Sequence, residues 1–181
     1  LAVRQAAGLF DISHMGEVRF DGAGAAAFLD RLVTRRVADL KPGRIRYGLV
    51  ANEAGGILDD VLVYHLRDAA ENSYFLLVVN ASNREKILDW LRPRLAAEQD
   101  VHLTDVTRDW AMIAVQGPRA LEMAQPLVDV ELASMKYYTG REALIAGHGG
   151  IVSRTGYTGE DGCELIVGSH AAPGVWQRLV D

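Results

Sequence analysis

Three apolar segments of β character follow one another within residues 47–80, and this feature constrains the fold most strongly. Polar turns rich in Asn, Asp and Gly separate the three segments at residues 52–56 and 67–73. Strands joined by turns this short pair with their neighbours as antiparallel hairpins. The sequence therefore predicts antiparallel sheet in this region and not a regular βαβ array.

Helices and further strands are predicted around these segments. Apolar residues at helical spacing predict helices over residues 22–35 and 82–95, the second opened by a capping box of Ser82 and Glu85. Three further helices are predicted, over residues 1–8, from Pro118 and over 171–181. Further strands are predicted over 17–20, 101–106, 110–116 and 163–167. A hairpin is predicted over 142–154, with its turn at Gly147–Gly150. This mixture predicts an α+β fold with mixed and antiparallel sheets in ferredoxin-like layers.

Composition restricts the class of protein. Hydrophobic residues make up 49% and charged residues 24% of the 181 residues, as in globular proteins. No apolar run reaches the roughly 18 residues of a membrane span, so no membrane association is expected. The single cysteine, Cys163, excludes a disulfide framework and a multi-cysteine metal site, and its acidic neighbours favour a packing role over a nucleophilic one.

The charge is uneven along the chain. The net charge of −5 argues against a nucleic-acid partner. Residues 30–46 nevertheless hold six basic and two acidic side chains. Two interpretations stay open for this segment, a docking surface for an acidic partner or a solvated helix face followed by a loop.

Asp59 and Asp60 are the most informative candidate residues. They lie inside the predicted strand ILDDVLVY, whose alternating positions are apolar on both faces. At least one carboxylate must therefore approach apolar surroundings, which is costly unless it is paired. One interpretation is a carboxylate that polarises a substrate nitrogen or takes its proton. The other is a turn-capping aspartate that accepts hydrogen bonds from the backbone of residues 53–56.

The segment Ser153–Glu164 is the second candidate. Its three glycines allow close backbone approach and positive φ, and it carries Tyr157, Glu160, Asp161 and Glu164. It contains neither a phosphate-binding loop motif nor a dinucleotide-binding fingerprint. Its acidic residues would make at most a weak site for a hard cation. The alternative is a connection between strands that uses glycine for its turns.

Other polar residues are weaker candidates. His14 has no second histidine at metal-ligand spacing, and adjacent Ser13 and His14 point to opposite faces of an extended chain, so they form no hydrolase triad. Asn80 and Ser82 end a buried strand and open a helix. That corner presents hydrogen-bond donors to a ligand or serves only as a helix cap.

Five segments together resemble the aminomethyltransferase, or T-protein, family of the glycine cleavage system. They are AGLFDISHMGE (7–17), YGLVANEAGGILDDVLVY (47–64), VVNASNREK (78–86), AVQGP (114–118) and SRTGYTGEDGCEL (153–165). The resemblance implies transfer of a one-carbon unit from the aminomethyl-lipoate of H-protein to tetrahydrofolate, with release of ammonia. It implies no metal, and it implies a cytoplasmic protein, or a mitochondrial matrix protein in a eukaryote.

The resemblance also assigns residues. It places Asp60, the second aspartate of GGILDD, near N10 of the folate as the catalytic carboxylate. It makes Glu164 the carboxylate that holds the amino-amide edge of the pterin. The full set of folate contacts that it implies is Met15, Tyr47, Val78, Asn80, Tyr157 and Glu164.

The family pattern sets expectations for the domains as well. Residues 1–48 plus 116–181 are expected to form a discontinuous folate-binding domain, and residues 49–115 an inserted α+β domain. Family chains are about twice as long, so we expect a fragment that lacks the C-terminal β domain, and its activity alone stays open. Relatives keep two alternatives open, another folate-dependent one-carbon transferase or demethylase and a non-catalytic folate-binding protein.

Overall fold

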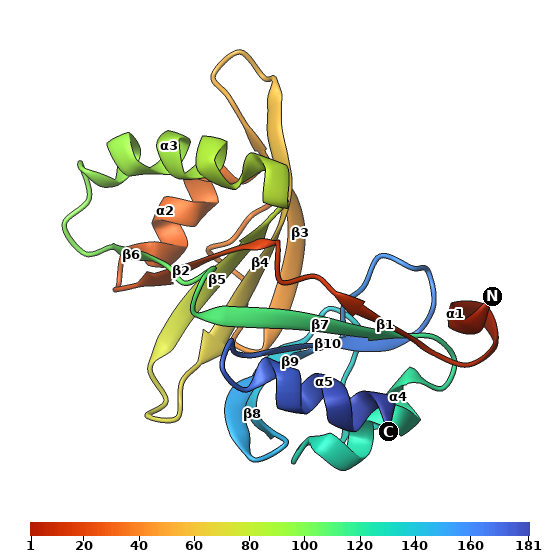
Figure 1. Ribbon diagram of the computed structural model, residues 1–181. Coiled ribbons are helices and arrows are strands. Elements are labelled where there is room, and N and C mark those ends of the chain that lie inside the picture. Colours follow the sequence, from red (N-terminus) through yellow and green to blue (C-terminus); the bar gives the residue numbers. More distant parts are fainter. The chain divides into compact units, whose positions relative to one another are not determined.

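The computed structural model describes all 181 residues and divides the chain into two compact units (Figure 1). Unit 1 consists of Leu1–Ser13 and Arg108–Asp181, and unit 2 consists of His14–Thr107. Each unit contains one five-stranded sheet whose neighbouring strands run antiparallel. With the helices of both units, these sheets confirm the predicted α+β class.

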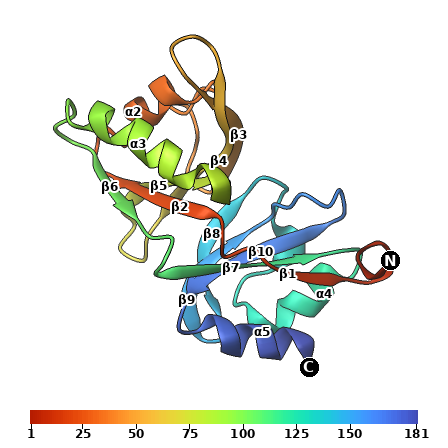
Figure 2. The ribbon, with the colours of Figure 1, turned by 45° about the horizontal axis from the view of Figure 1, so that its top comes forward.

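The sheet of unit 2 contains the predicted central hairpins. Its strands, in spatial order, are β3 (Arg44–Ala51), β4 (Ile57–Arg67), β5 (Ser73–Val79), β2 (Gly16–Asp21) and β6 (His102–Asp105). Helices α2 (Ala25–Leu32) and α3 (Arg84–Leu95) lie against one face of this sheet, and the short 3-10 helix η1 (Ala81–Asn83) leads into α3 (Figure 2). None of the helices of the chain has the length and apolar character needed to cross a membrane.

Strand alternation decides which residues of unit 2 meet the helices. Val61 and Val63 of β4 pack in one core with Phe28 of α2 and Leu88 of α3. The intervening Leu62 points to the opposite face and is also buried. Both faces of β4 are therefore apolar, as its sequence predicts.

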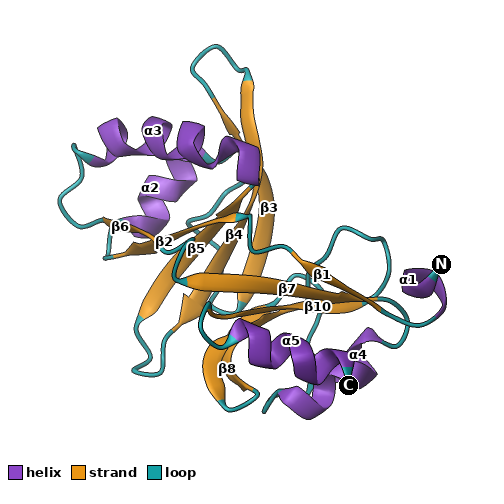
Figure 3. Cartoon of the chain, in the orientation of Figure 1, coloured by secondary structure: helices purple, strands orange, loops and turns teal.

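Unit 1 has the same general construction. Its strands, in spatial order, are β1 (Gly8–Asp11), β7 (Trp110–Gln116), β10 (Gly162–Gly168), β9 (His148–Ser153) and β8 (Gly140–Ile145). Its helices are α1 (Ala2–Gln5), α4 (Ala120–Ala124), η2 (Gln125–Leu127), η3 (Leu132–Ser134) and α5 (Ala172–Val180) (Figure 3). Apolar residues of α4 and α5 share a core with Cys163 and Leu165 of β10.

The boundaries of the compact units differ from those of the expected domains. The chain passes between units at residues 13/14 and 107/108, and not near residues 48 and 116. The reason is strand pairing, because β2 pairs with β5 and β3 pairs with β4. Residues 14–48 therefore belong to the same sheet as the segment that follows them.

The N-terminal segment and one hairpin depart from the sequence prediction. The helix predicted over residues 1–8 covers only Ala2–Gln5, and Gly8 instead opens β1, paired with β7. The hairpin of β8 and β9 turns at Ala146 and Gly147, where φ is 52° and 86°. Gly150 lies within β9 and not in the turn. Glycine is needed there because a Cβ would come 2.4 Å from the Ile166 carbonyl oxygen.

Candidate functional site

Predicted folate residues of unit 2 share one face of its sheet. Tyr47 of β3 lies directly opposite Leu62 of β4, which lies directly opposite Val78 of β5. Asp60 precedes Leu62 by two residues and therefore points to the same face. This is the face that α2 and α3 do not cover.

Met15 and Asn80 extend the same group. The last pair of the β2–β5 ladder is Gly16 with Val79, and Met15 and Asn80 are the next residues outward on the two strands. We call the group of Met15, Tyr47, Asp60, Val78 and Asn80 the Asp60 face. The structure thus brings together in unit 2 residues that are up to 65 positions apart in sequence, from 15 to 80.

Asp59 has a structural role. It is buried on the helix-covered face, and its Oδ2 accepts a hydrogen bond from the backbone N–H of Asn80 at 2.8 Å. Its Oδ1 accepts from the side-chain amides of Asn80, at 2.9 Å, and of Asn83. The carboxylate therefore holds the end of β5 and the start of η1 and α3.

This arrangement corrects two details of the sequence analysis. The expected turn-capping role at residues 53–56 belongs to Asn52, whose Oδ1 accepts from the backbone N–H groups of Ala54 and Gly56 at 3.1 and 2.8 Å. The capping box predicted for Ser82 and Glu85 is wrong, because α3 begins after Asn83 with no side-chain cap. Asp59, from a neighbouring strand, stabilises this corner instead.

Asp60 is held differently. It is half-buried, and its Oδ1 accepts one hydrogen bond from Asn80 Nδ2 at 3.0 Å, while its Oδ2 has no partner in the protein. Asn80 Nδ2 also donates to the Asp60 backbone oxygen at 3.1 Å. With its nitrogen committed to the two aspartates, Asn80 keeps its amide oxygen as an acceptor. The pair presents a fixed carboxylate oxygen and an amide oxygen that are available to N–H groups of a ligand.

Glu164 belongs to unit 1 and lies on β10, directly opposite Ser153 of β9. It is buried, on the face opposite to the core residues Cys163 and Leu165. The Thr155 hydroxyl donates to its carboxylate, and the Ser153 hydroxyl donates to Thr155 at 2.7 Å. This relay holds a carboxylate in fixed orientation inside the unit.

Close packing explains two of the three glycines of the segment 153–164, which connects β9 to β10. A Cβ at Gly156 would lie 2.1 Å from Gln116 Oε1, and one at Gly162 would lie 2.3 Å from the Val115 carbonyl oxygen. The Gln116 amide nitrogen donates to the Thr155 carbonyl oxygen at 3.0 Å, so the loop wraps around this side chain. Tyr157, the remaining predicted folate contact, lies at the loop tip and is 67% exposed.

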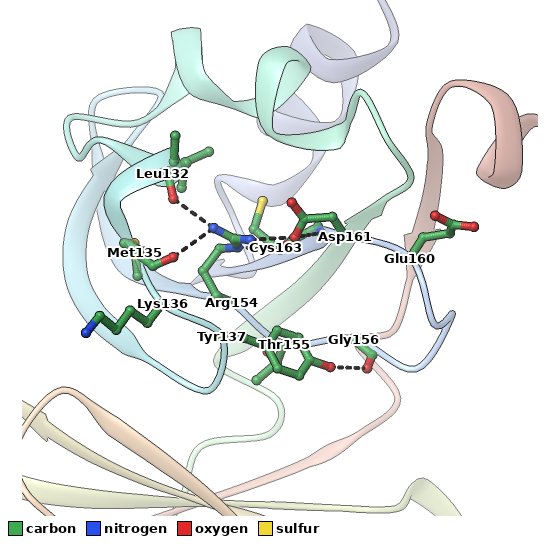
Figure 4. A network of polar contacts seen from close by, with 12 residues as sticks. Leu132, Met135, Lys136, Tyr137, Arg154, Thr155, Gly156, Glu160, Asp161 and Cys163 are labelled. Atoms are coloured by element: carbon green, nitrogen blue, oxygen red, sulfur yellow. Dashed lines mark hydrogen bonds and ion pairs between the residues drawn. The ribbon is translucent and has the colours of Figure 1, made fainter.

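Arg154 anchors the base of this loop (Figure 4). Its Nη1 donates to the carbonyl oxygens of Leu132 and Met135, at 2.9 Å each, and its Nε donates to that of Gly162 at 2.9 Å. Its remaining nitrogen pairs with Asp161. The guanidinium is buried, and its bonds join residues 132–135 to Asp161 and Gly162 at the end of the loop, so we assign Arg154 to loop structure.

The acidic residues of the loop do not converge. Glu160 pairs with Arg4, Asp161 with Arg154, and Glu164 with Thr155. No group of three or more His, Cys, Asp or Glu side chains in the chain is arranged to hold a metal ion. Cys163 is fully buried, and burial raises the pKa of its thiol to about 12, in agreement with the packing role predicted for it.

A cavity of about 420 Å³ lies elsewhere in unit 1, beside α5. It contains none of the residues that the resemblance assigns to the folate. Ser13 lines it, but the Ser13 hydroxyl is engaged with the backbone of Met112. Its other lining residues are Asp11, Ala111, Ile113, Ser169, Ala172, Pro173 and Trp176.

The basic segment 30–46 is partly neutralised within unit 2. Arg31 pairs with Glu98 and Arg46 with Asp39. Asp30 caps the backbone N–H groups of Val37 and Ala38. The cations that remain exposed and outside these pairs are Arg35, Arg36, Lys41 and Arg44. Docking of an acidic partner on them stays a prediction.

The fold and the Asp60 face define an α+β protein in which two adjacent aspartates on one strand accept hydrogen bonds from the same asparagine, Asn80. The whole chain, residues 1–181, matches the family model described as the GCVT N-terminal domain. The chain therefore belongs to the family of the GCVT N-terminal domain.

Curated relatives agree with this assignment. The aminomethyltransferase of Rubrobacter xylanophilus is 47% identical over 180 residues, which are 99% of this chain and 47% of the relative. That of Deinococcus deserti is 46% identical over 180 residues, 99% of this chain and 49% of the relative. The chain spans about half the length of the curated relatives that it matches.

Solved structures show the same fold. The glycine cleavage system aminomethyltransferase T of Bartonella henselae is similar with a TM-score of 0.85 and 31% identity, over 98% of this chain and 46% of that one. A heterotetrameric sarcosine oxidase from a Corynebacterium species is similar with a TM-score of 0.74, over 98% of this chain and 84% of that one. Its 15% identity shows a shared fold alone.

Proposed function

We propose that this chain carries the catalytic carboxylate and tetrahydrofolate contacts of an aminomethyltransferase of glycine cleavage. The donor is the aminomethyl group on the lipoyl arm of H-protein, and the acceptor is tetrahydrofolate. The names of the similar curated proteins and the similarity to the Bartonella henselae structure support this proposal.

The geometry of Asp60 is the observation that carries the proposal. A half-buried carboxylate with one oxygen fixed by Asn80 and the other unpaired suits an N–H donor of a bound substrate. Asn80 is in turn fixed by the buried Asp59, so the orientation of Asp60 is prepared before a ligand arrives. Such preorganised acceptors stabilise positive charge as it develops during a reaction.

The chemistry follows from that position. In the transfer, the carbon of the aminomethyl group becomes bonded to N5 and N10 of tetrahydrofolate as its bonds to sulfur and to nitrogen break. The two protons lost from N5 and N10 go to the lipoyl sulfur, as a thiol, and to the departing ammonia. Asp60 accepts a hydrogen bond from N10–H, which makes N10 a better nucleophile.

Unit 1 contributes a separate part of the proposal. Glu164 is a buried, oriented carboxylate, and a carboxylate accepts two parallel N–H bonds of the kind that the amino-amide edge of a pterin offers. Tyr157 is an exposed aromatic side chain at the tip of the same loop. We assign both to the folate, and variants of unit 1 test this independently of Asp60.

The test is turnover by an Asp60→Asn variant, made in a chain extended to the full length of the curated relatives, with aminomethylated H-protein as donor and formation of 5,10-methylenetetrahydrofolate as readout. Loss of one oriented charge should lower kcat by about a hundredfold or more while folate binding changes little. Asp89→Asn, an exposed aspartate of α3, is the matched control and should keep full activity. Unchanged turnover in Asp60→Asn would contradict the proposed role.

The donor distinguishes this function from the alternatives. If a methylated amine or sulfonium compound replaced H-protein as the working donor, the chain would belong to another folate-dependent transferase or demethylase. If folate bound without turnover of any donor, it would be a folate-binding protein.

A further inference from the structure

Glu17 lies on the same side of the sheet as the residues of the Asp60 face, although the resemblance assigns it no role. It is paired directly with Val78 in the β2–β5 ladder, and Val78 is paired with Leu62. Directly paired residues of antiparallel strands point to the same face. Glu17 therefore shares a face with Val78 and Asp60, on the side away from α2 and α3.

The side chain of Glu17 is buried without a partner. The residue is 1% exposed, and its Oε1 makes no hydrogen bond. Its Oε1 is the one buried side-chain nitrogen or oxygen of the chain that lacks a hydrogen-bond partner. Its backbone is satisfied, because its N–H donates to Thr107 Oγ1 at 2.9 Å and its carbonyl accepts from Val106 at 3.0 Å. The missing hydrogen bond therefore concerns the carboxyl group alone.

This environment favours the neutral acid. Burial, reinforced by the negative charge of Asp105, raises the pKa of Glu17 from 4.5 to about 8. At neutral pH the carboxyl group is therefore mostly protonated and combines one O–H donor with a carbonyl acceptor. An acid in that form matches a polar group of a ligand without adding a second negative charge to the Asp60 face.

A purely structural role does not account for this residue. A buried polar atom without a hydrogen bond destabilises the fold, and Leu, of similar size, would fill the same space at no such cost. Val78, which lies opposite, is an apolar residue that is equally covered, at 4% exposed. Unpaired buried polar groups in native proteins call for a missing partner.

We propose that Glu17 is a further folate-binding residue of the Asp60 face, and that its carboxyl group donates a hydrogen bond to the bound folate. This inference rests on the proposed function. It adds to the site a contact on β2, one strand beyond Val78.

Two variants separate binding from folding. Glu17→Leu removes both the donor and the acceptor, whereas Glu17→Gln keeps a donor and an acceptor of nearly the same shape. Each is compared with the wild type by calorimetric titration with 5-formyltetrahydrofolate and by thermal unfolding without ligand. Glu17→Leu should bind about tenfold more weakly and yet unfold at a higher temperature, because an unpaired polar group has been removed. Glu17→Gln should bind within about threefold of the wild type.

The opposite results overturn the inference. Equal affinity of Glu17→Leu and wild type would mean that the carboxyl group does not contact the ligand. A lower unfolding temperature for Glu17→Leu, with Glu17→Gln also weakened in binding, would make Glu17 a structural residue. Absence of folate binding by the wild type would instead contradict the proposed function, and with it this contact.

Discussion

The two aspartates of the ILDD segment show how far neighbouring residues can differ. Asp59 faces the helices and accepts three hydrogen bonds from Asn80 and Asn83. Asp60 faces the opposite side and keeps one oxygen unpaired. The sequence predicts that a carboxylate is buried here, but it does not show which one, because the deciding partners lie about 20 residues further along the chain.

The structural role of Asp59 predicts a large loss of stability on truncation. Asp59→Ala leaves the backbone N–H of Asn80 unpaired at a buried corner, so the free energy of unfolding should fall by about 3 kcal/mol. Asp60→Asn, which replaces the neighbouring carboxylate by an isosteric amide, should cost less than about 1 kcal/mol. Urea unfolding of both variants measures the difference. Equal losses would show that the two roles are not divided in this way.

The buried acid Glu17 predicts a pH-dependent stability. Its pKa is near 4.5 when unfolded and about 8 when folded, so the folded state binds the proton more tightly between these values. The stability that protonation of Glu17 contributes is therefore present below about pH 4.5 and is lost as the pH rises towards 8. The slope of its contribution is at most about 1.4 kcal/mol per pH unit. The difference in stability between wild type and Glu17→Gln, followed by urea unfolding from pH 5 to pH 8.5, should show this slope. A constant difference would contradict it.

At the scale of elements, local patterns predicted most strands and missed those that depend on distant partners. The hairpin of β3 and β4 follows from apolar runs around the Asn52–Gly56 turn, and the structure confirms it. Strand β1 was not predicted, because its four residues gain their strand conformation only from pairing with β7. The β8–β9 turn was misplaced, because Gly150 serves close packing and not a turn.

Neighbouring glycines of β9 provide a matched test of that explanation. Gly150→Ala places a methyl group against the Ile166 carbonyl oxygen, which cannot move independently of β10, so stability should fall by about 2 kcal/mol. Gly149→Ala meets nothing within 4 Å and should change stability by less than about 0.5 kcal/mol. Thermal or urea unfolding of both variants measures the two changes in stability. A tolerated Gly150→Ala would show that β9 and β10 are packed less closely.

At the scale of the whole molecule, the order of pairing explains why the unit boundaries were not predicted. Unit 1 joins the first 13 residues to a segment that begins at residue 108, through the β1–β7 ladder. Nothing local in either segment encodes that pairing. The motifs of the family, in contrast, selected five residues that share the Asp60 face of unit 2, and their role in folate binding stays a prediction. Glu17, the further contact that we propose, gives no signal in the sequence, because it alternates with Val18 and Phe20 just as Arg19 and Asp21 do.

The central claim is that this chain binds a reduced folate through the assigned residues, and calorimetric titration with 5-formyltetrahydrofolate tests it most directly. We predict saturable binding that weakens about tenfold or more in Tyr47→Ala, on the Asp60 face, and in Glu164→Ala, in unit 1. Leu144→Ala, an exposed side chain of β8 outside both residue sets, should bind as the wild type does. Absence of saturable binding by the wild type, or equal binding by all variants, would contradict the account.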